Sequence, residues 1–166
     1  MQRIYVLFFI SLATRRIEYV ACTSNPDGGW VAQQARNLVM QFGDDHRFGF
    51  LIHDRDTKFS HAFDEVFRIE GIRVIRTPVQ APNANAYAER WVRTLRADCL
   101  DRILILGRRH LEHLLRVYLC HYNDHRPHRA LPLLPPNGRD PTPLNATAHV
   151  RRRDLLGGLI HEYDAA

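Results

Sequence analysis

The sequence predicts an α/β domain in which helices flank a mixed β-sheet. Two apolar, β-rich runs open the chain at residues 4–12 and 17–22, and a third apolar run at 48–52 ends in acidic residues. Between and after these runs, apolar residues recur three and four positions apart, which is the spacing of a helix face. Strand runs that alternate with helical runs are typical of a sheet covered by helices.

The first two apolar runs are separated by the short polar segment 13–16. This length suits an antiparallel hairpin with a tight turn. A cluster of Ser, Asn, Pro, Asp and Gly at 24–29 then marks a loop, and apolar residues of helical period follow from Trp30 to Phe42. We therefore expect a hairpin and then a helix that packs on it.

After the run at 48–52, Ser60 can cap a helix, and Gly71 can end it. Residues 72–76 alternate between apolar and polar, as in a short strand. A long helix is expected over 87–106, and a second helix after Gly107. These elements form one domain over residues 1–135. Residues 136–166, rich in Pro, Gly, Asn and Thr up to His149, are expected to be an extended, flexible tail.

The composition points to an anionic partner. The formal net charge is +5, which favours nucleic acid. Three cysteines without paired spacing argue against a disulfide scaffold and for a reducing compartment, so a cytoplasmic location is expected. The first apolar run is too short to span a bilayer, and we expect no membrane association.

Two acidic residues stand where strand and helix ends are predicted. Asp54 follows the apolar run at 48–52, and Glu89 lies in the first turn of the helix expected from residue 87, with 34 residues between them. Carboxylate oxygens that converge from such positions suit magnesium, with water and phosphate as further ligands. The pair is thus a candidate centre for phosphoryl transfer. Asp56 is the alternative to Asp54, because it lies two residues further on an extended chain.

At these residues the sequence resembles the catalytic cores of retroviral-type integrases and insertion-sequence transposases. The resemblance depends on three strings in order, at residues 54–59, 81–90 and 122–131, and it covers roughly residues 1–135. It implies a ribonuclease-H-like fold. It also implies cleavage and joining of DNA strands with Mg²⁺, or Mn²⁺ in its place, held by an Asp, Asp, Glu triad. Asp54 would be the second carboxylate of that triad and Glu89 the third.

Basic residues near these carboxylates are candidate DNA contacts. Arg93 and Arg96 follow Glu89 at helical spacing, so the three share one helix face. Lys58 lies just after the acidic turn, and Arg126 lies in the third string. We expect all four basic residues to contact phosphate. The alternative for Arg93 and Arg96 is an ordinary solvent-exposed ion pair, and the alternative for Arg126 is that it closes the fold around Pro127.

The sequence departs from the family at its beginning. The family has a first Asp on an opening strand, and no aspartate precedes Asp27 here. We therefore expect a core without its first carboxylate and its opening strand, with unpaired strand edges and self-association into a homo-oligomer. Whether such a chain is an active enzyme stays open. A non-catalytic DNA-binding remnant and a ribonuclease-H-like nuclease are the alternatives.

Overall fold

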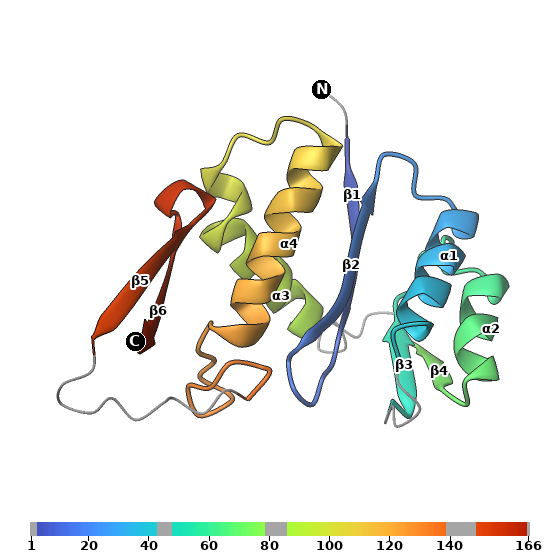
Figure 1. Cartoon of the computed structure of the whole chain (residues 1–166). Helices are drawn as coiled ribbons and strands as arrows, with labels where there is room; N and C mark the ends of the chain where they lie inside the picture. The colour runs from blue at the N-terminus through green and yellow to red at the C-terminus, as the bar shows by residue number, and fades with distance from the viewer. Residues whose placement is uncertain (1–2, 43–47, 79–85, 139–148, 166) are drawn as a thin grey trace. The chain divides into compact units, whose positions relative to one another are not determined.

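The computed structural model describes residues 3–42, 48–78, 86–138 and 149–165 (Figure 1). By contacts, the chain divides into two compact units, which are described separately below. The first comprises Met1–Phe9 and Glu18–Arg90, and the second comprises Ile10–Ile17 and Trp91–Ala166. The strands and helices are β1 (Tyr5–Ile10), β2 (Ile17–Thr23), α1 (Gly28–Val39), β3 (Phe50–His53), α2 (His61–Ile69), β4 (Arg73–Arg76), α3 (Ala86–Asp98), α4 (Arg108–Asp124), β5 (Val150–Leu155) and β6 (Ile160–Ala165).

The strands of the first unit form two separate pairs. β1 pairs with β2, and β3 pairs with β4 in parallel, with Phe50 opposite Arg73 and His53 opposite Arg76. Among the described residues no ladder of hydrogen bonds joins the two pairs. In this part of the chain the strands are therefore present as short pairs.

Helices α1 and α2 pack against each other over both strand pairs. Phe63 of α2 is fully buried, and its ring centroid lies 6.3 Å from that of Phe9 in β1 and 5.5 Å from that of His53 in β3. Burial of such an aromatic side chain contributes about 1.5–3 kcal/mol. Side-chain packing on the helices thus links the strand pairs where backbone hydrogen bonds do not. The buried core of this unit consists of Val31, Ala32, Ala35, Leu38, Phe63, Phe67 and Ile72.

Residues next to the helix ends account for where α1 begins and where α2 ends. Asp27 caps α1, since its Oδ1 accepts the backbone N–H of Trp30 at 2.7 Å. Helix α2 begins after Ser60 as predicted, but the Ser60 side chain makes no capping hydrogen bond. Gly71, with φ of +73°, follows the end of α2 in the left-handed region that glycine adopts without strain.

Helix α3, which begins in the first unit and ends in the second, is shorter than predicted. It ends at Asp98 rather than near Leu106, because Cys99 leaves helical geometry with φ −136° and ψ −67°. The Asp98 carboxylate accepts hydrogen bonds from the Tyr118 hydroxyl at 3.1 Å and from Nε of Arg126 at 3.0 Å. These partners on and just after α4 hold the chain where it turns. Helix α4 starts after Gly107, as predicted. None of the described helices is long and apolar enough to cross a membrane.

The expectation of a flexible tail is wrong for residues 149–165. β5 and β6 form an antiparallel hairpin in register from Val150 opposite Ala165 to Leu155 opposite Ile160. The hairpin is anchored by Glu162, whose buried carboxylate lies 3.1 Å from Nδ1 of His121. Nε2 of His125 and Nε of Arg153 lie 3.7 and 3.4 Å from the same carboxylate.

This anchor also affects the imidazole of His121. Burial lowers the pKa of His121, and the hydrogen bond to Glu162 offsets this only in part. The hairpin is held by a buried ionic contact of Glu162, and a search for periodic apolar residues does not detect such a contact. For this reason the sequence predicted a tail. Residues 139–148, included in that prediction, lie outside the described part of the chain.

Candidate active site

Asp54 lies directly after β3, at the carboxyl end of the parallel β3–β4 pair, and its side chain is exposed. Its Oδ1 accepts the backbone N–H of Asp56 at 3.0 Å, which holds the carboxylate against the turn. The turn is also tied to the other strand, because Nε of Arg55 donates to the carbonyl of Thr77 at 3.0 Å. An exposed carboxylate therefore lies on a turn that is held by an internal hydrogen bond and by a hydrogen bond to Thr77.

The second acid of the turn, Asp56, is held by Lys58. The Lys58 ammonium lies 3.0 and 2.9 Å from the two Asp56 oxygens, and the Lys58 backbone N–H donates to Oδ1 at 2.9 Å. The backbone bond and then the ammonium lower the pKa of Asp56, while the Asp56 carboxylate raises the pKa of Lys58. A metal ion at Asp56 would have to displace the ammonium. The predicted contact between Lys58 and DNA phosphate stays a prediction.

The donor set at this turn suits a hard cation. Mg²⁺ prefers carboxylate oxygen, and the second oxygen of Asp54 has no hydrogen-bond partner among the described residues. Both oxygens of Asp56 are occupied. The choice of Asp54 rather than Asp56 as a metal ligand stays a prediction.

Glu89 lies in the first turn of α3, and its side chain is exposed. It belongs to the same unit as Asp54, but the loop at 79–85 that leads to it lies outside the described residues. Within the described ranges, no group of three or more His, Cys, Asp or Glu side chains could hold a metal ion. The convergence of Asp54 and Glu89 on one metal site stays a prediction.

The arginines proposed to contact DNA differ in their surroundings. Arg93 is exposed on α3. Arg96 pairs with Asp101, the shortest contact being 3.1 Å, in an exposed setting where such pairs add little stability. Arg126 donates to Asp98, and its guanidinium lies 6.0 Å from the centroid of the Tyr122 ring. A guanidinium has five donors, so a phosphate contact of Arg126 stays a prediction alongside this structural bond.

Asn123, within the third string, has a structural function that sequence reasoning missed. Its Oδ1 accepts the backbone N–H of Ile17 at 3.0 Å, and its Nδ2 donates to the Ile17 carbonyl at 3.0 Å. All of these groups are buried. The amide therefore pairs with a strand residue as a neighbouring strand would. The side-chain chemistry of Asn allows this, but nothing in its local sequence indicates the partner.

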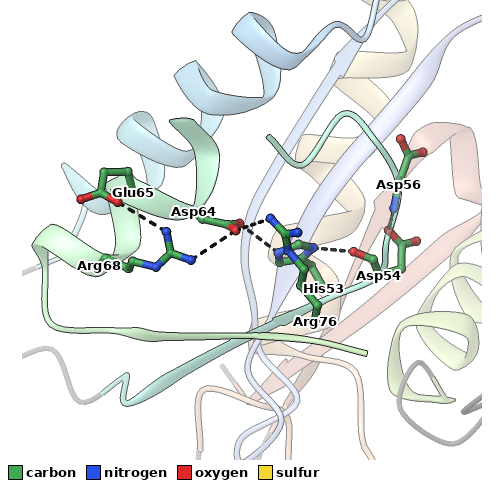
Figure 2. Close-up of polar contacts among 7 residues, drawn as sticks. All are labelled: His53, Asp54, Asp56, Asp64, Glu65, Arg68 and Arg76. Atoms are coloured by element: carbon green, nitrogen blue, oxygen red, sulfur yellow. Dashed lines mark hydrogen bonds and ion pairs between the residues drawn. The ribbon is translucent and has the colours of Figure 1, made fainter. Parts of the chain in front are cut away.

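Asp64 is the other residue that sequence reasoning missed. It is fully buried on α2, next to Phe63, and its carboxylate contacts His53, Arg68 and Arg76 (Figure 2). From sequence, an acidic residue in a helix is normally predicted to be exposed, because acidic side chains are rarely buried. Its spacing to Arg68 was the one local hint of a partner.

Comparison with known proteins supports the resemblance found in the sequence. Residues 70–136 match the integrase core domain family. The predicted resemblance to integrase cores is confirmed. Glu89 and the string at 122–131 lie within the matched residues, whereas Asp54 precedes them. No curated protein matches the chain.

Among solved structures, the chain is similar to the catalytic core domain of BIV integrase. The TM-score is 0.57 at 15% sequence identity, and the match covers 80% of this chain and 82% of that one. At this identity the likeness shows the fold. The chain therefore has the mixed α/β fold of an integrase catalytic core, as the sequence predicted.

Proposed function

We propose that this chain is the catalytic core of a DNA integrase or transposase, and that Asp54 and Glu89 are ligands of a divalent metal ion. The observation that carries the proposal is the exposed Asp54 carboxylate at the carboxyl end of β3, in a fold similar to an integrase catalytic core. The integrase core match over 70–136 supports the assignment of Glu89, which lies inside it.

Magnesium held by these carboxylates would activate the attacking oxygen and stabilise the oxygen that leaves the scissile phosphate. The chain's own residues would bind the metal ion and the DNA phosphates. Asp54 and Glu89 supply oxygen ligands, and the turn around Asp54 keeps its carboxylate in one place. Arg93 and Arg96 present guanidinium groups one and two turns further along α3, where they can bind DNA phosphates by charge-assisted hydrogen bonds.

Plasmid nicking tests the proposal directly. The purified chain is incubated with supercoiled DNA and Mg²⁺ or Mn²⁺, and nicked and joined products are counted. Asp54→Asn and Glu89→Gln are each expected to lower the rate by at least about 100-fold, since each removes a metal ligand. Asp56→Asn is the matched control, because it alters an acid of the same turn that is already bonded to Lys58. Equal activity of Asp54→Asn and the wild type would refute the assignment.

The alternative is a DNA-binding function without catalysis. One observation favours it: Arg93 is exposed on α3 of a chain whose formal net charge is +5, and positive charge supports binding to nucleic acid whether or not catalysis follows. This alternative predicts that DNA binding, measured by fluorescence anisotropy, falls when Arg93 is changed to Ala. It also predicts that no nicking occurs with either metal ion.

A further inference from the structure

A buried carboxylate, that of Asp64, is connected through His53 to the turn that carries Asp54. The Asp64 side chain is only 1% exposed, and it faces the core from α2. Oδ1 lies 3.0 Å from Nε2 of His53, and Oδ2 lies 2.7 Å from a terminal nitrogen of Arg76 and 3.5 Å from one of Arg68 (Figure 2). Burial of a carboxylate costs several kcal/mol unless it is paired and hydrogen-bonded. Asp64 meets that condition with partners from β3, β4 and its own helix.

His53 connects this carboxylate to the backbone of Asp54. While Nε2 faces Asp64, Nδ1 lies 2.5 Å from the carbonyl oxygen of Asp54. Two aromatic side chains contact the ring, whose centroid lies 4.8 Å from that of Phe59 and 5.5 Å from that of Phe63. The His53 side chain is thus held at both nitrogens and packed against two aromatic rings, and it bridges a buried acid and the exposed turn.

We propose that Asp64, acting through His53, is a positioning residue for the Asp54 carboxylate. The inference depends on the proposed function, because it assigns a purpose to the fixed geometry of a metal ligand. By holding the Asp54 carbonyl, the imidazole restricts the rotation of the backbone that aims the Asp54 side chain. The bond from the Asp56 N–H to Oδ1 of Asp54 then fixes the carboxylate relative to that backbone. Metal sites need such support from outside the ligands themselves.

A purely structural function of Asp64 makes different predictions. In that case its pairs with Arg68 and Arg76 would matter, and its contact with His53 would not. Arg68→Ala separates the two explanations, since it removes one ion pair of Asp64 on the side away from His53 (Figure 2). Asp64→Asn keeps the shape of the side chain and changes the group that faces His53.

Two measurements on the full chain test the proposal. The first is Mn²⁺ affinity, measured by electron paramagnetic resonance of the free ion. Asp64→Asn is expected to weaken binding by about 10-fold or more, which is typical for groups that orient a metal ligand. Arg68→Ala is expected to stay within about twofold of the wild type under the same conditions. Wild-type affinity in a folded Asp64→Asn variant would overturn the proposal.

The second measurement needs no metal. The Asp56 amide donates to Oδ1 of Asp54, so its hydrogen exchange reports how well the turn is held. Exchange of this amide is expected to be at least about 10-fold faster in Asp64→Asn than in Arg68→Ala, with the Val31 amide of α1 unchanged as a control for global opening. Equal exchange in the two variants would overturn the proposal.

The two proposals fail in different ways. If neither the wild type nor any variant binds Mn²⁺, the proposed function fails, and amide exchange still decides whether Asp64 holds the turn. If Asp64→Asn does not fold, His53→Gln takes its place in both measurements, because it leaves Asp64 paired with Arg68 and Arg76. Wild-type behaviour of that variant would likewise refute the positioning by His53.

Discussion

Replacement of Asn123 by Ala should destabilise the protein strongly, although no charge and no large apolar side chain is lost. The Asn123 amide satisfies both the N–H and the C=O of Ile17, each at 3.0 Å in a buried environment. These residues are 106 positions apart in the sequence, so the two bonds close a very long loop of chain. Ala cannot replace either bond.

The size of the destabilisation follows from the two Ile17 backbone groups that Asn123→Ala leaves without a partner. A buried backbone group that loses its partner costs about 1–3 kcal/mol, so two such groups cost roughly 2–6 kcal/mol. A water molecule that enters the vacated space could satisfy one of them, because the site is polar. We therefore expect Asn123→Ala to lower the free energy of unfolding by about 2–4 kcal/mol.

Urea unfolding followed by circular dichroism gives the measurement. Asn137→Ala is the matched control, because the same side chain is removed from an exposed hydrogen bond, between Nδ2 of Asn137 and Oδ1 of Asp124 at 2.6 Å. The control should change the free energy of unfolding by about 0.5 kcal/mol or less. If the free energies of unfolding of Asn123→Ala and Asn137→Ala differ by less than about 1 kcal/mol, the reasoning about buried, unsatisfied backbone groups is refuted.

Three further predictions concern the core and the titrating groups. Phe63→Ala should lower the free energy of unfolding by about 3–5 kcal/mol, because the ring is fully buried; a urea midpoint close to that of the wild type would contradict this. In the native protein at pH 8, a thiol reagent should modify Cys120, which is exposed, and should spare Cys22 and Cys99, which are buried. Burial also raises the pKa of Cys99 to about 11, so rapid reaction of all three thiols would be a failure of the prediction. Acidification from pH 7 to pH 5 should destabilise the fold, because burial lowers the pKa of His121 below its ordinary 6.5. The unfolded chain then takes up a proton that the folded chain does not, so stability present above pH 6.5 is lost as the pH falls through that value. The loss of stability between pH 7 and pH 5 should be smaller in His121→Asn than in the wild type. Equal losses in the two proteins would contradict the assignment of this pH dependence to His121.

The elements that could be predicted from the sequence are those with local signals. Helix α2 shows Phe63 and Phe67 on one face and Gly71 at its end, and all three behave as expected. Asp54 was placed correctly after a strand, because an apolar run bounded by polar residues is typical of a strand. The expectation that this strand is buried is wrong, since the side chains of Phe50 and Ile52 are exposed. Neither inference needed knowledge of a distant partner.

The features that could not be predicted depend on residues far along the chain. Helix α3 stops at Asp98 where Tyr118 and Arg126 bind its carboxylate, and these lie 20 and 28 residues further on. The apolar pattern of the segment itself runs on past that point. Asp64 is buried because His53 and Arg76 on neighbouring strands reach it, and no periodicity of α2 reports that. Side-chain pairs of this kind override the pattern from which helix lengths and exposed faces are inferred.

The contacts around Asp64 also bear on the order in which the chain folds. They join residues 11 and 12 positions apart, within one strand–helix–strand segment, whereas the Asn123 pair joins residues 106 apart. Local contacts cost little loop entropy and form early, and distant ones form late. During synthesis, the segment from β3 to β4 can therefore fold as it leaves the ribosome, before Asn123 has been added to the chain. The turn that carries Asp54 would then be in place before the second half of the protein exists.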